Sequence, residues 1–102
     1  MYLNIIHSYR DVVAICDAEL LGKTFEQDKF QLNIKENFYK GAENNQPVSE
    51  EQALKILKNM KAEDATFNIV GKKSIQTAIQ AGVIDENSIL KIQGIPFSLV
   101  LI

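Results

Sequence analysis

The sequence is poor in the residues from which metal centres and reactive thiol sites are built. It contains one cysteine, Cys16, and one histidine, His7. A single cysteine excludes an intrachain disulfide and a cysteine-based metal site, and a single histidine removes the usual zinc sites. We therefore expect no metal ion and no other cofactor. A Cys16/His7 nucleophile pair is the only thiol chemistry left open.

Long apolar stretches are absent as well. Uninterrupted apolar runs extend over only a few positions, whereas a membrane-spanning helix needs about 20 residues. The first residues, MYLNIIHSYR, show neither the basic lead nor the small-residue cleavage site of a signal peptide. We expect a soluble, cytoplasmic protein without membrane contact.

The sequence also lacks a basic excess, since its net charge is −2 and its pI is near 5.3. Nucleic-acid binders normally carry excess positive charge to neutralise phosphates. The distribution is uneven, however, because five lysines stand against Glu63 and Asp64 between Lys55 and Lys73. The overall charge therefore does not exclude a basic face on this acidic protein.

The composition suffices for one packed domain. The chain has 102 residues, of which 46% are hydrophobic, and this length is close to the commonest domain size. We predict a single compact domain over residues 1–102.

Apolar and alternating segments predict strands at both ends of the chain. Residues 2–7 (YLNIIH) and 12–16 (VVAIC) are rich in β-branched residues and predict a hairpin. In residues 30–35, apolar and polar positions alternate, which predicts a strand with one exposed face. Residues 89–93 and 97–102, joined by the segment GIP, predict a second hairpin.

Two helices are predicted between these strands. Ser49 as N-cap and Gln52 at the third helical position form a capping box. The apolar stripe of the helix that follows is Ala53, Ile56, Leu57 and Met60. A second helix is expected over residues 72–81, with Ser74 on its polar flank and Gly82 ending it in the left-handed conformation. These elements predict a two-layer α+β fold, with a mainly antiparallel sheet and two main helices packed on one face.

The segment 66–84 (TFNIVGKKSIQTAIQAGVI) reads as strand, glycine turn and helix, and it holds the first candidate site. Gly71 permits the turn, or else Asn68 is the N-cap and the helix begins one turn earlier. In both cases free amides and the positive end of the helix dipole lie beside Lys72 and Lys73. Asn68, Gly71, Lys72 and Lys73 therefore form a candidate site for an anion or an RNA backbone, although most helix N-termini bind only water.

A second candidate cleft comprises Cys16, Asp17, Glu19 and Lys23. Asp17 is predicted as the N-cap of a single helical turn that Gly22 ends. Acidic neighbours raise a thiol pKa, so Cys16 is expected to be a buried structural residue. Alternatively, Asp17 and Glu19 serve acid–base chemistry or hold a hard cation, although carboxylates two positions apart on one turn point in different directions.

Five short motifs stand in order along the chain. They are CDAELLGKTF from Cys16, FYKG from Phe38, NIVG from Asn68, AIQAGVI ending at Ile84, and GIP from Gly94. Together they resemble the small archaeal family catalogued as domain of unknown function, family 424. The resemblance implies one α+β domain in archaeal cytoplasm and, by association with translation genes, an RNA or translation-accessory role. Where the family pattern implies a histidine after the GIP proline, this chain has Phe97, so a role for an imidazole there does not carry over.

Three hypotheses about function follow. The preferred one is a non-enzymatic binding module that contacts RNA or the translation machinery through the Lys72/Lys73 face. The second is a protein-binding adaptor that uses a sheet edge or the apolar C-terminal strand. The third is an enzyme or small-molecule binder centred on Cys16, Asp17 and Glu19. We expect a binding protein rather than an enzyme, with no residue assigned as catalytic.

Overall fold

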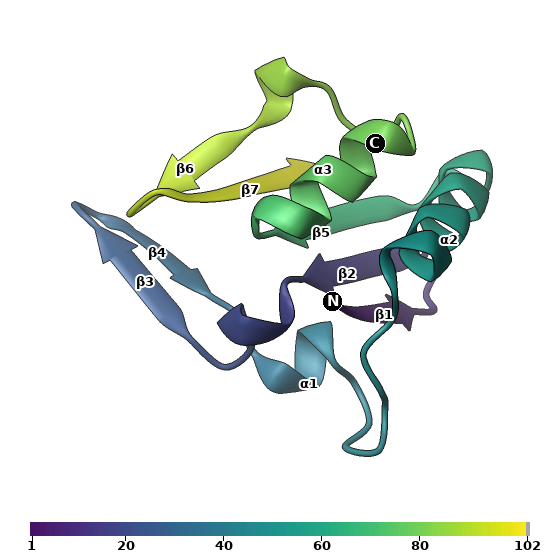
Figure 1. The fold of residues 1–102 in the computed structure, drawn as a ribbon, viewed down its shortest axis with the longest axis horizontal. Coiled ribbons are helices and arrows are strands. Elements are labelled where there is room, and N and C mark those ends of the chain that lie inside the picture. The colour runs from purple at the N-terminus through teal and green to yellow at the C-terminus, as the bar shows by residue number, and fades with distance from the viewer. Residues whose placement is uncertain (102) are drawn as a thin grey trace.

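A five-stranded sheet forms the centre of the computed structural model, which describes residues 1–101 (Figure 1). In spatial order its strands are β1 (Tyr2–Ile6), β2 (Val12–Cys16), β5 (Thr66–Val70), β7 (Ile95–Val100) and β6 (Leu90–Ile92). Only β2 and β5 are parallel; the other three neighbouring pairs are antiparallel. The predicted mainly antiparallel sheet is confirmed.

The two main helices pack on one face of this sheet, as predicted. They are α2 (Glu50–Ala62) and α3 (Lys72–Gln80). The opposite face, called the rear face below, carries smaller elements: a 3-10 turn η1 (Ala18–Leu20), a hairpin of β3 (Thr24–Gln27) and β4 (Phe30–Asn33), and the short helix α1 (Glu36–Tyr39). A second 3-10 turn, η2 (Glu86–Ser88), precedes β6.

The alternation of side chains along the central strands divides the core in two. Val13 and Ile15 of β2 join Phe67 and Ile69 of β5 beneath the helices. The intervening residues of β2, with Val70, pack instead against the rear elements. Because the middle of the sheet is covered on both faces, β2 reads as a continuous apolar run and not as an alternating one.

The predicted N-cap of α2 and the predicted glycine end of α3 are confirmed. Ser49 Oγ accepts a hydrogen bond from the Gln52 amide at 3.1 Å, and the Ser49 amide donates to Gln52 Oε1 at 3.0 Å. At the end of α3, Gly82 has φ of 75°, its amide bonds the Ile79 carbonyl at 3.0 Å, and the Val83 amide bonds the Ala78 carbonyl at 3.0 Å. This pair of bonds is a Schellman motif, which satisfies carbonyls at the helix end.

The capping box yields a stability prediction. Replacing Ser49 by Ala should lower the free energy of unfolding by about 1 kcal/mol, because an amide in the first turn loses its acceptor. Ser49→Asp is the control, since a carboxylate can accept the same bond and should retain most of the stability. Urea unfolding followed by circular dichroism measures both. Equal losses in the two variants would contradict the role of this cap.

The structure differs from the strand predictions in three places. Strand β3 was not predicted, because Phe25 is its only large apolar residue. The alternating segment 30–35 forms β4, which pairs with β3 in a separate two-stranded sheet, and Phe30 is 76% exposed. The β6–β7 turn consists of Gln93 and Gly94, so the rest of GIP belongs to the strand.

The type of turn explains why the β6–β7 turn lies earlier in the chain than predicted. Gln93 and Gly94 have φ of 50° and 78°, and positive φ at both positions is typical of the two-residue turn that best matches strand twist. Pro96 is tolerated inside β7, where it lies opposite Lys91 of the edge strand β6. Ile102, the end of the predicted strand, lies outside the described residues.

Candidate functional site

The N-terminus of α3 is occupied by a side chain of the protein itself, Asp17. Its Oδ1 accepts hydrogen bonds from the Ser74 amide and the Ser74 hydroxyl, both at 2.8 Å. Its Oδ2 accepts from the Lys73 amide at 3.1 Å. The Asp17 carboxylate therefore caps a helix that lies 56 residues further along the chain and places a negative charge at the positive end of the helix dipole.

The parallel pairing of β2 and β5 explains this contact. Cys16 lies opposite Val70 in the register, so the residues that follow both strands meet at the same edge of the sheet. The Asp17 amide donates to the Val70 carbonyl at 3.0 Å, and the Gly71 amide donates to the Pro96 carbonyl at 2.8 Å. Three strand ends thus hold Asp17 against the start of α3.

Gly71 makes the close approach possible. A Cβ atom at this position would lie 2.3 Å from Asp17 Cγ, and its φ of 108° is strained for any other residue. Of the two predicted helix starts, the structure has the glycine turn, with α3 beginning at Lys72. Asn68 lies inside β5, where it pairs with Ala14 and Leu99, and does not cap the helix.

Two sequence predictions about this region are wrong. Asp17 does not cap its own turn, because η1 has no side-chain cap bond. Ser74 does not lie on a polar, exposed flank: it is fully buried and bonded to Asp17. Neither could be read from local spacing, because both depend on a partner more than 50 positions away.

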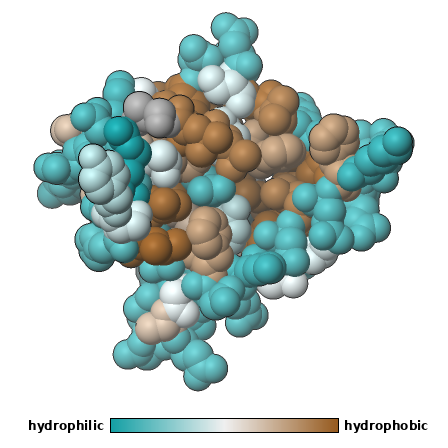
Figure 2. Space-filling model, turned by 180° about the vertical axis from the view of Figure 1, so that it is seen from behind, coloured by the Kyte–Doolittle hydropathy of each residue, from teal (hydrophilic) through white to brown (hydrophobic). Residues whose placement is uncertain are grey.

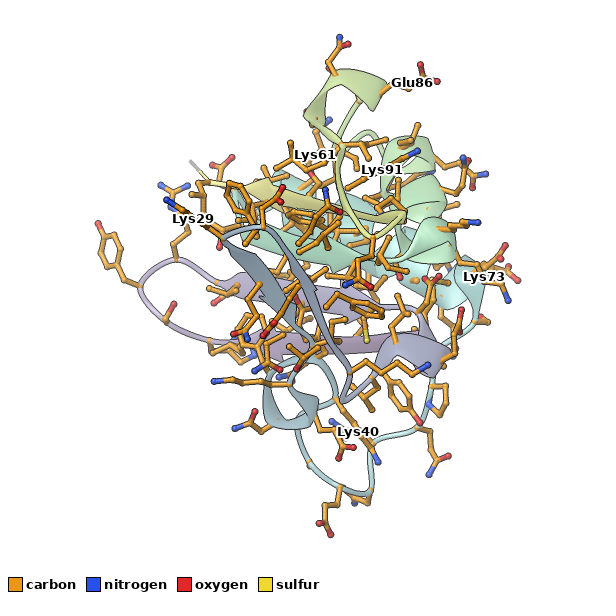
Figure 3. All side chains as sticks on the ribbon, turned by 90° about the vertical axis from the view of Figure 1, so that its left-hand side faces the viewer. Lys29, Lys40, Lys61, Lys73, Glu86 and Lys91 are labelled. Atoms are coloured by element: carbon orange, nitrogen blue, oxygen red, sulfur yellow. The ribbon has the colours of Figure 1, made fainter. Side chains whose placement is uncertain are left out.

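The two predicted sites meet at one cleft. A shallow cleft of about 290 Å³ is lined by Asp17, Glu19, Leu20, Gly71, Lys72, Lys73, Ile95 and Pro96. Cys16, Lys23 and Asn68 are not among its lining residues. Lys72 and Lys73 are exposed, and Figure 3 shows Lys73 at the outer edge of the molecule. The amides of Lys73 and Ser74 are already bonded to a carboxylate, so an external anion would meet ammonium groups beside a negative charge.

Cys16 precedes Asp17 in the chain and is fully buried, in the core of the rear face. Burial, followed by the negative charge of Asp17, raises the pKa of the Cys16 thiol from its ordinary value of 9.0 to about 12. Burial also raises the pKa of the neighbouring Tyr39 hydroxyl to about 12. Both groups are therefore protonated at neutral pH, and a protonated thiol is a poor nucleophile.

The Cys16/His7 pair that the composition left open does not form. Cys16 lies opposite Tyr2 at one end of the first hairpin, whereas His7 follows Ile6 at the other end. A strand of this length separates them by roughly 15 Å, since each residue adds about 3.3 Å. His7 Nδ1 instead lies 3.4 Å from Asp11 Oδ1 in an exposed turn.

The thiol environment makes a labelling prediction. Cys16 should react with a disulfide reagent much more slowly in the native protein than after denaturation, because it is buried and protonated. The measurement is the absorbance change of a thiol-exchange reagent with and without denaturant. Rapid native labelling that titrates below about pH 7.5, lower than a free thiol, would contradict this structure of the site and favour the enzyme hypothesis.

The rear face carries a groove that the sequence did not predict. It measures about 370 Å³ and lies between the β3–β4 hairpin and the strands β6 and β7. Its lining residues are Gln27, Phe30, Gln31, Leu32, Leu90, Lys91, Ile92 and Phe97. Phe30 and Leu90 are 76% and 58% exposed. The groove is missed because an alternating pattern marks one face of β4 as apolar but does not say whether that face is covered.

The hairpin is held against the sheet by polar contacts at its tip. The Gln93 amide donates to Gln27 Oε1 at 2.7 Å, and the Gln93 side chain donates to the Glu26 carbonyl. These bonds join the β3–β4 hairpin to the β6–β7 turn. The apolar residues behind the tip remain uncovered, and Figure 2 shows hydrophobic residues gathered in the middle of this face.

Two further observations concern residues 1–101, which the structure describes. Nowhere in that part of the chain do three or more His, Cys, Asp or Glu side chains gather in a group that could hold a metal ion. None of the helices found there combines the length and apolar character needed to cross a membrane.

The fold and these sites define a small α+β domain with a sheet covered by two helices on one face and partly covered by a hairpin on the other. The chain belongs to the family described as "Protein of unknown function (DUF424)", whose model matches residues 6–102. The family resemblance of the five sequence motifs is thereby confirmed.

A solved structure has the same architecture. It is the crystal structure of an uncharacterized conserved protein from Methanopyrus kandleri, which is 26% identical in sequence and superposes with a TM-score of 0.82. The match covers 97% of this chain and 88% of the other. No curated protein matches this sequence.

Proposed function

We propose that this domain is a non-enzymatic binding module that docks a protein surface on its rear groove. The observation that carries the proposal is the position of its exposed apolar side chains. Five large hydrophobic residues are exposed within residues 1–101. Of these, Phe30 and Leu90 line the groove, and Leu99 follows Phe97 by two positions on β7 and so lies on the same face. Leu101, 77% exposed, comes two residues further on.

Clustering distinguishes this face from an ordinary surface. Single exposed apolar residues are normal on soluble domains, whereas a concave apolar patch with a polar rim is typical of an interaction site. Here Gln27 and Gln31 provide polar groups beside Phe30 and Leu32. An aromatic side chain such as Phe30 also offers a large area that is buried when a partner binds.

The enzyme hypothesis receives less support from the geometry. A cleft between the two turns exists, as that hypothesis requires, but both carboxylate oxygens of Asp17 are bonded to α3. Cys16 does not line the cleft and is a buried, protonated thiol. Glu19 is then the one free carboxylate that lines the cleft within the described chain, and a lone carboxylate is a weak basis for catalysis.

A cysteine scan tests the docking proposal, since the native thiol is buried. Gln31→Cys introduces a reporter at the groove and leaves the apolar side chains of Phe30 and Leu90 in place. Lys58→Cys, on the exposed side of α2, is the control. In native extract, maleimide labelling of Gln31→Cys should be slower than in dilute purified protein, while labelling of Lys58→Cys should not change. Equal labelling in both media would overturn the proposal, because a docked partner must cover the groove.

Contact with RNA through Lys72 and Lys73 is a second candidate, favoured by one observation. Both ammonium groups lie at the exposed start of α3 and line a second depression with Gln76 and Gln80, next to the cleft described above. Amide and ammonium groups together can contact a phosphate backbone. Glu50 in the same depression and the bonded Asp17 weaken this site.

The double substitution Lys72→Glu/Lys73→Glu tests the RNA candidate. Losing two phosphate contacts should reduce the slope of log binding constant against log salt concentration by roughly 1.5 to 2 units. The reduction should be the same for RNAs of different sequence, because phosphates carry no sequence information. Stability should change by no more than about 0.3 to 1 kcal/mol per charge. Fluorescence anisotropy with single-stranded and structured RNA at several salt concentrations is the measurement. If the unsubstituted protein does not bind RNA at low salt, this candidate is wrong.

A further inference from the structure

We infer that the outer edge of β1 binds an extended segment of a partner protein, which joins the five-stranded sheet as an added strand antiparallel to β1. This surface is separate from the rear groove. Strand β1 lies at one border of the sheet, and β6, which lines the groove, lies at the other (Figure 1). The inference therefore goes beyond the function proposed above and does not depend on it.

The hydrogen bonds of β2 fix the direction of the backbone groups in this part of the sheet. Asp11 and Asp17 flank β2 in the chain. The Asp11 carbonyl accepts from the Thr66 amide at 2.9 Å, and the Asp17 amide donates to the Val70 carbonyl at 3.0 Å. Odd-numbered residues of β2 thus direct their backbone groups toward β5. Successive residues of a strand direct these groups to opposite edges, so the even-numbered residues of β2 face β1.

The same alternation identifies the free backbone groups of β1. The even-numbered residues of β2 pair with Tyr2, Asn4 and Ile6, which direct their own amides and carbonyls inward. Leu3 and Ile5 therefore direct theirs away from the sheet. Within residues 1–101, the amides and carbonyls of these two residues have no hydrogen-bond partner.

These free groups select the chemistry of the occupant. Donors and acceptors alternate along the edge at the spacing of an extended chain, which rises by about 3.3 Å per residue. An extended polypeptide backbone carries the same alternation and can bond every free group, as in the recognition of peptides by strand addition. A phosphate backbone offers acceptors alone and would leave the carbonyls unpaired.

The chain itself already pairs with this edge at one residue. The Val48 amide donates to the Met1 carbonyl at 2.7 Å, and the Met1 amine donates to the Val48 carbonyl at 3.4 Å. An exchange of two hydrogen bonds between facing residues is characteristic of antiparallel strands. The segment before Val48 does not continue the pairing, because the Asn45 amide bonds the Ala42 carbonyl in a turn. The rest of the edge is left for another chain.

The two borders of the sheet differ in their protection against strand addition. Strand β6 has three residues and carries the exposed Lys91, and both short length and charge discourage pairing at an edge. Strand β1 has five residues, YLNII, with no charge, no proline and no interruption of its register. The sheet is therefore guarded at β6 and open to an added strand at β1.

Amide hydrogen exchange on the unmodified chain tests this inference. In dilute purified protein the Leu3 and Ile5 amides should exchange much faster than the Asn4 amide, which bonds β2. Peptides are then selected from a random library of short peptides for binding to the chain, and at least one should protect both the Leu3 and the Ile5 amide. If no selected peptide protects both, or if both are already as protected as Asn4 in dilute protein, the inference is wrong. Protection that instead rises with the concentration of the purified protein would also overturn it, because the occupant would be a second copy.

A methyl group on the Ile5 amide gives a matched variant. Because Cys16 is the only cysteine, residues 1–15 can be synthesised and ligated to the rest of the chain at that residue. N-methylation removes the outward donor and adds bulk at the edge, but it keeps the Ile5 side chain and the bonds to β2. The circular dichroism spectrum should therefore not change, while the selected peptide should bind at least about tenfold more weakly.

The control is the chain methylated on the Tyr9 amide. Tyr9 is fully exposed in the β1–β2 turn, so this chain should bind the peptide like the unmodified protein. Equal affinity of the chain methylated at Ile5 and the unmodified chain would overturn the inference. The exchange measurement uses the unmodified chain and so decides the question even if a ligated chain does not fold.

Discussion

Replacing Gly71 by Ala is expected to destabilise the domain strongly, and more than the same substitution at Gly94. The new Cβ would lie 2.3 Å from Asp17 Cγ and within 2.7 Å of both carboxylate oxygens. Asp17 cannot move aside without losing its bonds to the start of α3. Overpacking costs about 1–3 kcal/mol, and a residue other than glycine in this backbone region costs a similar amount, so we expect a loss of roughly 3 kcal/mol or more.

Gly94→Ala is the matched control for this prediction. Gly94 also has a positive φ, 78°, but an added Cβ there meets nothing within 4 Å. Only the backbone strain applies, so the loss should be about 1–2 kcal/mol. Denaturant unfolding of both variants measures the difference. The free energy of unfolding should fall with denaturant concentration at the same slope in both, which shows that they share one unfolding transition. Equal losses would show that contact with Asp17 does not constrain position 71.

The second large effect is expected for Asp17→Ala. The substitution leaves three donors at the start of α3 without their acceptor: the part-buried amide of Lys73 and the buried amide and hydroxyl of Ser74. Each unsatisfied buried group costs about 1–3 kcal/mol, and a lost cap costs about 1, so we expect a total of about 3 kcal/mol after relaxation. Asp17→Asn should lose less, because the amide side chain keeps one acceptor oxygen.

Asp85→Ala is the control for Asp17. Asp85 caps η2, where its Oδ1 accepts from the Asn87 amide at 2.9 Å, but the residue is exposed. Water can replace the lost acceptor there, so the loss should stay near about 0.5–1 kcal/mol. Hydrogen exchange adds a local readout, since the Lys73 and Ser74 amides should lose protection in Asp17→Ala. If Asp17→Ala and Asp85→Ala lose the same stability and the Lys73 and Ser74 amides stay protected, capping of α3 by Asp17 is refuted.

The candidate sites connect these predictions to function. Asp17 neutralises the helix end that the sequence suggested as an anion site. The amides of Lys73 and Ser74 are bonded to its carboxylate, so only the ammonium groups of Lys72 and Lys73 remain for an external anion. The apolar groove lies on the other side of the sheet from the main helices. Variants of Asp17 should therefore change stability, whereas variants of Phe30 or Leu90 should change association.

Sequence alone determined the features that depend on neighbours a few positions apart. The Ser49–Gln52 capping box, the glycine end of α3 at Gly82 and the hairpin of β1 and β2 were all predicted, because their hydrogen bonds span three to five residues or follow one short turn. The family resemblance through ordered motifs and the α+β class likewise followed from the order of these elements.

Tertiary structure alone decided where Asp17, Ser74 and Phe30 lie. Asp17 is an equally good cap for its own turn and for α3, and only the parallel register of β2 and β5 selects the second. Phe30 occupies an apolar position of an alternating strand, but the tip of its hairpin is held to the β6–β7 turn by Gln27 and Gln93, so the ring stays exposed. Alternation along a strand specifies which side chains share a face, while burial of that face depends on chain segments brought to it from more than 60 positions away.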